Sequence, residues 1–150
     1  MRKLHHLLAS TAVAVLLVAG CDDDEDVDDG TLTASIDGSA FTATTVTGTY
    51  ASNVLAFSGL GGSGTQILIS IPNVTTTGTF DVGIGQAGVA QVVVGTQVWT
   101  TALTGGTGSV VITALSSSQA SGTFTFTAPA STGGATGTKV VTSGTFTIEF

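Results

Sequence analysis

The chain has 150 residues, of which ten are acidic and three are basic, giving a formal net charge of −7. Nucleic-acid binding requires Lys and Arg side chains that neutralise phosphates, so this composition excludes nucleic acid as a partner. The single cysteine excludes an intramolecular disulfide, and the length predicts one hydrophobic core.

Residues 1–20 have the features of an export signal. Arg2 and Lys3 precede an uncharged, mostly apolar run over residues 7–19. This run is shorter than the roughly 20 residues that a helix needs to span a bilayer. We therefore expect residues 1–20 to be a signal peptide that is removed from the mature protein.

The end of this segment resembles the lipobox of bacterial lipoproteins. Val18, Ala19 and Gly20 directly precede Cys21, the only cysteine. The resemblance implies that a signal peptidase recognises these three residues, and that diacylglycerol is attached to the Cys21 thiol, which reacts as a thiolate. It also implies a membrane partner, the inner or outer membrane of a bacterial cell envelope, with the protein periplasmic or surface-exposed. A general signal peptide with an incidental cysteine is the alternative.

Residues 21–30 combine this cysteine with a strongly acidic run. Seven of residues 22–29 are Asp or Glu, and such a run is expected to form an extended, solvated tether. The alternative is a calcium loop, because alternate positions carry the carboxylates of Asp24, Asp26 and Asp28. Asp29 and Ser35 stand where such a loop requires Gly and Glu, so the tether is favoured.

From Thr31 onward, apolar residues alternate with Thr or Ser, which is the period of β-strands. The alternation is clearest at 123–128 and 145–150, where Thr and Glu face solvent and aromatic residues enter the core. Further strands are predicted over residues 32–36, 41–49, 54–58, 66–71, 78–82, 89–94, 97–102 and 109–115. About ten short strands predict a single all-β domain over residues 31–150, either an antiparallel β-sandwich or a small lipocalin-like barrel.

A Gly-Thr-aromatic triplet recurs at residues 48–50, 78–80, 122–124 and 144–146. We interpret it as a packing pattern in which Gly permits a bend, Thr faces solvent and the aromatic ring enters the core. A repeated binding element is the alternative.

Five segments resemble a family of small bacterial lipoproteins with one β domain and no assigned function. They are IDGSAFTA at 36–43, GTF at 78–80, GSVVIT at 108–113, SGTFTF at 121–126 and SGTF at 143–146. The resemblance covers nearly all of residues 31–150, and it implies a fold without implying an activity.

Removal of residues 1–20 takes away both histidines and leaves Lys139 as the only basic residue. Serine-type catalysis then has no histidine base, and we expect Lys139 to be solvated. Asp37, with Gly38, predicts a hairpin turn, while Asp81 and Glu149 are expected on polar strand faces. The sequence therefore predicts no enzyme activity, no catalytic residue, no metal site and no cofactor.

Two further features have a structural interpretation. Residues 59–64 are rich in glycine like a phosphate-binding loop, but no lysine and no helix start follow them, so a flexible hairpin loop is predicted. Trp99 alternates with its neighbours in a strand and is expected in the core, with ligand stacking as the alternative.

Two functions follow from these features. The first is a membrane-anchored structural or interaction domain that contacts an envelope protein or polymer. The second is a lipocalin-like carrier in which the small side chains of Ala34, Ala43 and Ala56 face inward and leave space for a small apolar ligand. A bilayer-spanning barrel is disfavoured, because most predicted strands are shorter than the required length of about 9–11 residues.

Overall fold

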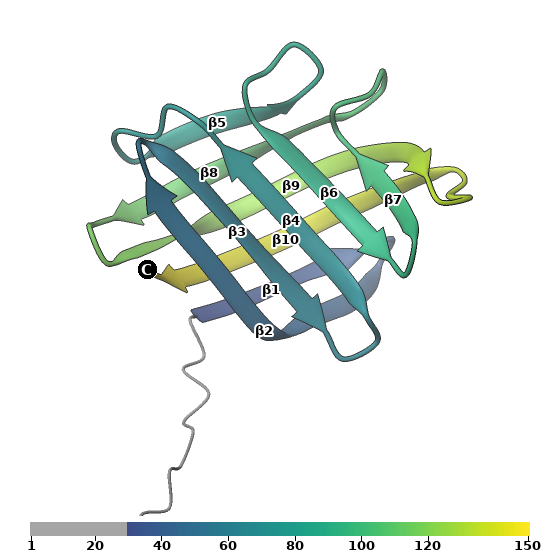
Figure 1. Ribbon diagram of the computed structural model, residues 1–150, viewed down its shortest axis with the longest axis horizontal. Helices are drawn as coiled ribbons and strands as arrows, with labels where there is room; N and C mark the ends of the chain where they lie inside the picture. Colours follow the sequence, from purple (N-terminus) through teal and green to yellow (C-terminus); the bar gives the residue numbers. More distant parts are fainter. Residues whose placement is uncertain (1–29) are drawn as a thin grey trace, which may run out of the picture.

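The computed structural model describes residues 30–150, which form ten β-strands (Figure 1). The signal peptide, Cys21 and the acidic tether lie outside the described residues. The strands are β1 (Gly30–Ile36), β2 (Ser39–Ala51), β3 (Val54–Gly61), β4 (Thr65–Ile71), β5 (Gly78–Gly83), β6 (Val89–Val94), β7 (Gln97–Thr100), β8 (Thr107–Leu115), β9 (Gln119–Thr132) and β10 (Thr138–Glu149). The all-β prediction is confirmed, and each predicted strand is present.

All ladders between these strands are antiparallel, in the order β10-β1-β2-β3-β4-β6-β7-β9-β8-β5. An additional ladder joins β10 to β9, so eight strands close into a ring and β8 and β5 extend from β9. The molecule thus combines both expected architectures: two packed layers of a sandwich whose hydrogen bonding closes as in a barrel.

Two long strands form the corners where one layer becomes the other. In β2, residues 39–42 pair with β1 and residues 43–51 pair with β3. In β9, residues 119–129 pair with β10, whereas Ala130 and Thr132 pair with β7. Figure 1 shows the result, with β2, β3, β4, β6 and β7 crossing in front of β5, β8, β9, β10 and β1. We call these the front layer and the back layer.

The two corner strands and β10 extend beyond their predicted ranges of 41–49, 123–128 and 145–150. β2, β9 and β10 contain 13, 14 and 12 residues. Gly122 and Gly144, where the triplet predicts a bend, lie inside strands and pair with Phe146 and Phe124 respectively. The Phe124 ring uses the space that Gly144 leaves, whereas Gly122 permits the close approach of the Val111 backbone in β8.

The recurring Gly-Thr-aromatic triplet now has a packing explanation. An added Cβ on Gly144 would lie 2.5 Å from the Phe124 ring, so the glycine of one triplet makes room for the aromatic ring of another. On the outer side of the back layer, the threonines of two triplets fall into one row, Thr42-Thr33-Thr145-Thr123, across β2, β1, β10 and β9. The triplet thus places an aromatic ring inside and a threonine outside.

Aromatic rings join the two layers at the centre of the core. Phe57 of the front layer stacks on Phe146 of the back layer with ring centroids 4.4 Å apart, and lies 6.3 Å from Phe124. Trp99 is buried, as predicted, and its Nε1–H donates to the carbonyl of Thr136 at 3.1 Å.

Side chains close one end of the molecule, at the end of β2. The Tyr50 hydroxyl donates to the carbonyl of the fully buried Val74 at 2.7 Å. The Phe150 ring lies 5.8 Å from the Tyr50 ring and is 38% exposed. The expectation that Phe150 enters the core was therefore wrong, because its strand ends at Glu149 and the ring lies over this closed end.

Candidate functional site

The interior of the described domain is filled by side chains. Leu32, Leu55, Ile67, Phe124 and Ile148 are at most 1% exposed, and an added Cβ on Gly48 would collide with the Ile148 side chain of the opposite layer. Of the small residues expected to face inward, Ala56 faces outward instead, because it alternates with the buried side chains of its neighbours in β3. Ala34 is 8% exposed and Ala43 packs against the core, so these two side chains face inward as predicted.

The end opposite Tyr50 carries a cavity, which we call the mouth pocket. Its volume is about 300 Å³. It lies beside the β1–β2 turn and is lined by Ile36, Asp37, Ser39, Ala40, Phe41, Ser63, Thr65, Val92, Val94 and Lys139. The apolar part of the lining comes from Phe41 and the partly buried Ile36 and Val94, whereas the rim carries hydroxyl groups and two charges.

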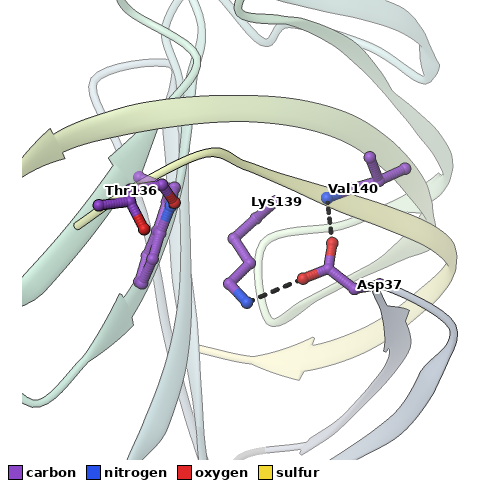
Figure 2. A network of polar contacts seen from close by, with 5 residues as sticks. Asp37, Thr136, Lys139 and Val140 are labelled. Carbon is purple, nitrogen blue, oxygen red and sulfur yellow. Dashed lines mark hydrogen bonds and ion pairs between the residues drawn. The ribbon is translucent and has the colours of Figure 1, made fainter.

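An ion pair crosses the rim of the mouth pocket (Figure 2). Lys139 Nζ donates to Asp37 Oδ2 at 2.8 Å, and the Val140 amide donates to Asp37 Oδ1 at 2.8 Å. Lys139 Nζ also lies 5.0 Å from the centroid of the Trp99 ring, within the range of a cation–π interaction. The prediction of a solvated Lys139 was therefore wrong: the side chain is 28% exposed and engages both partners.

A β-bulge gives Lys139 its direction. On β10, two residues separate Val141 from Gly144, whereas a single residue separates their partners on β9. Ser143 in this bulge has a φ of 50°. The extra residue reverses the alternation, so that Lys139 and the buried Val141 face inward while Val140 is 44% exposed.

The turn that carries Asp37 is the predicted hairpin. Asp37 and Gly38 have φ values of 51° and 84°, and Ile36 pairs with Ser39 across them, as in a type I′ turn. The hydrogen bond from Lys139 and that from the Val140 amide lower the pKa of Asp37 below its ordinary value. Asp37 is consequently ionised over a wider pH range than an ordinary aspartate.

A second depression, which we call the outer groove, lies on the solvent side of the front layer. Its volume is about 390 Å³, and it is lined by Thr47, Gly48, Thr49, Ala56, Phe57, Ser58, Leu68, Ile69, Ser70, Val89 and Gln91. None of these side chains is charged. The hydroxyls of Thr47 and Ser58 are hydrogen bonded to each other at 3.0 Å, and Leu68 is only half-buried.

Of the other predicted features, Asp81 and Glu149 fall outside both depressions, whereas Ser63 of the glycine-rich segment lines the mouth pocket. Asp81 and Glu149 are exposed, as expected for polar strand faces. Of residues 59–64, the first three belong to β3, and only residues 62–64 form the hairpin turn to β4. Within residues 30–150, no group of three His, Cys, Asp or Glu side chains could hold a metal ion, and no helix is long and apolar enough to cross a membrane.

A family model described as "Domain of unknown function (DUF6252)" matches residues 28–148. Searches of curated proteins and of solved structures found no match to the chain. The matched family description supplies no activity, so the surface of the domain is the basis for a functional proposal.

Proposed function

Since the chain belongs to the DUF6252 family of domains of unknown function, we propose from its surface that it is a structural or interaction domain of the bacterial cell envelope. It is anchored to a membrane by lipid on Cys21, which follows Val18, Ala19 and Gly20 in the order of a lipobox. Its partner is an envelope protein that binds the outer groove with an uncharged surface.

The observation that carries this proposal is the outer groove. It has a volume of about 390 Å³ and no charged side chain among its lining residues. Burying a charge without a counter-charge is costly, so a groove of this kind favours a partner surface that is also uncharged. Hydroxyl and amide groups at Thr49, Ser70 and Gln91 can fix the register of the partner by hydrogen bonds.

The small number of charged side chains within residues 30–150 also supports a binding role. Four charged side chains occur in this part of the chain, those of Asp37, Asp81, Lys139 and Glu149. Asp37 and Lys139 neutralise each other. The filled interior does not favour the alternative of a carrier with a central ligand cavity.

Photo-crosslinking in intact cells tests the proposal. A photoreactive amino acid is placed at Ser70, in the outer groove, or at Thr125, which is exposed on the back layer. We expect a discrete protein adduct from position 70 that disappears when Leu68→Lys introduces a charge into the groove. Position 125 is expected to give no such adduct.

Three results would contradict this proposal. They are the absence of an adduct at position 70, equal adducts from both positions, and an adduct at position 70 that consists of glycan rather than protein. An adduct at position 70 that persists with Leu68→Lys would also contradict the proposal, because it would place the contact outside the outer groove.

A further inference from the structure

We propose that the mouth pocket binds a small uncharged ligand that has an apolar body and one hydrogen-bonding head group, such as an amide or an alcohol, with the head group at Lys139. This site is separate from the outer groove, since the two share no lining residue. The inference therefore does not depend on the proposed function.

The floor of the mouth pocket suits the apolar body. Phe41 is 7% exposed, and the partly buried Ile36 and Val94 continue the apolar surface toward the rim. A volume of about 300 Å³ is at the lower end of the range for small-molecule sites, so we expect a short-chain ligand.

The rim suits a hydrogen-bonding head group. An ammonium group has three N–H donors, and Lys139 uses one of them for Asp37 Oδ2. The ammonium thus retains donor capacity at the edge of the pocket. Ser39 is exposed at the same rim and adds a hydroxyl that can donate or accept.

The charges at the rim favour a neutral head group. Asp37 compensates the charge of Lys139 at a distance of 2.8 Å. An anionic head group at Lys139 would therefore lie close to the Asp37 carboxylate, and a cationic one would lie close to the Lys139 ammonium. A neutral amide or alcohol avoids both repulsions and still accepts a charge-assisted hydrogen bond.

The bulge in β10 supports a specific placement of Lys139. Without the extra residue, the alternation of β10 would direct Lys139 outward. Ser143 instead adopts a φ of 50°, which costs energy in a non-glycine residue. Bulges are often found where a side chain is redirected toward a functional site.

The test uses three probes with the same apolar chain: hexanamide, hexanoate and hexylamine. They are titrated into the mature chain, residues 21–150 with Cys21→Ser, so that neither the apolar signal segment nor lipid or detergent competes for the pocket. Amide chemical shifts and the emission of Trp99, the only tryptophan, report binding. We expect saturable shifts around Phe41 and Val94 with hexanamide, and weaker binding of the two charged probes.

Variants of the ion pair then separate a binding role from a purely structural one. Lys139→Met keeps the aliphatic stem near Trp99 but lacks the donor, and we expect hexanamide affinity to fall about tenfold. Asp37→Asn removes the competing carboxylate, so hexanoate should now bind more tightly than hexanamide. The matched control, Leu68→Lys in the outer groove, should leave hexanamide binding unchanged.

The proposal is overturned if hexanamide gives no saturable shifts, or if the shifts map to the outer groove. Equal affinity for hexanamide in the parent chain and in Lys139→Met would also overturn it, because the ammonium would then have no part in binding. If Lys139→Met does not fold, the relative affinity of Asp37→Asn for hexanoate and hexanamide tests the proposal instead. If this variant still binds hexanoate more weakly than hexanamide, the proposal is contradicted.

Discussion

Asp37 links the β1–β2 turn to β10 through one side chain. Its backbone adopts the positive φ of the β1–β2 turn, its Oδ1 accepts from the Val140 amide, and its Oδ2 accepts from Lys139. An aspartate is suited to this position because it tolerates the left-handed region and accepts two hydrogen bonds. The residue thereby fixes the β1–β2 turn to β10 at the rim of the mouth pocket.

The lowered pKa of Asp37 predicts a pH-dependent contribution to stability. Its hydrogen bonds with Lys139 and with the Val140 amide lower the pKa in the folded state, so the contribution is present above the unfolded-state value of about 3.9. It is lost as the pH falls through the lower folded-state pKa. Because the pair is partly exposed, Asp37→Asn should reduce the free energy of unfolding at pH 7 by at most about 1 kcal/mol.

Urea unfolding at pH 7 and at pH 2 checks this prediction, with Asp81→Asn on an exposed strand face as the control. The difference between the parent chain and Asp37→Asn should shrink at pH 2, while the control should match the parent at both pH values. An equal loss at both pH values would assign the effect to the turn rather than to the ionised carboxylate.

At the scale of the strands, the alternation of Thr with apolar residues predicts the back layer well. Thr123, Thr125 and Thr145 are exposed and Phe124 and Phe146 are buried, because a half-buried strand repeats every two residues. In β10, the same two-residue period does not continue through Ser143 to the residues that precede it in the chain. Counting back from Phe146 places Val140 inside and Lys139 outside, and the bulge between Val141 and Gly144 reverses the two. Gly144 indicates that a bend is permitted there, but it does not specify an extra residue.

Deletion of Ser143 should remove this reversal. Val140 would then replace Val141 in the core, whereas Lys139 would face solvent and lose Asp37 and Trp99. A double-mutant cycle for Asp37→Asn and Lys139→Met should give a coupling of up to about 1 kcal/mol in the parent chain. In the deletion variant the coupling should fall to zero, with the β-sheet circular dichroism retained. Persistent coupling would show that the bulge does not set the direction of Lys139.

Close packing of rings over glycines makes a second prediction for these strands. Gly144→Ala should lower the free energy of unfolding by about 1–3 kcal/mol, the usual cost of overpacking a core. The reason is that the new Cβ would lie 2.5 Å from both ring and backbone atoms of Phe124. Gly62→Ala is the control, since its Cβ would meet no atom closer than 3.7 Å. Denaturant unfolding of both variants checks the difference, and equal stabilities would refute the packing explanation of the triplet.

At the scale of the whole molecule, ring closure joins the two layers into one structure. It depends on the ladder between β7 and the end of β9, in which Trp99 pairs with Ala130 and Val98 with Thr132. Local periodicity predicts the strands that take part in this ladder, but it carries no information about which strands pair. The choice between a sandwich and a barrel could therefore not be made from the sequence. The outward position of Ala56 was predictable, because Ala56 alternates with the larger apolar residues Leu55 and Phe57, which occupy the inner face.

A single core shared by both layers predicts cooperative unfolding. Phe57→Ala removes a ring that contacts Phe146 at a centroid distance of 4.4 Å, and it should cost about 3–5 kcal/mol. Trp99 emission and far-ultraviolet circular dichroism should report the same transition. Thr123→Ala, on the exposed back face, should change the stability by less than about 0.5 kcal/mol. Two separate transitions would contradict a shared core.

We propose that a lipid on Cys21 holds this β domain at a bacterial membrane, and intact mass analysis of the protein extracted from membranes checks this. We expect an N-terminal peptide that begins at Cys21 and carries diacylglycerol on the thiol, while Cys21→Ser abolishes both the cleavage and the lipid. A membrane-extracted protein that retains residues 1–20, or that begins elsewhere with an unmodified Cys21, would contradict it.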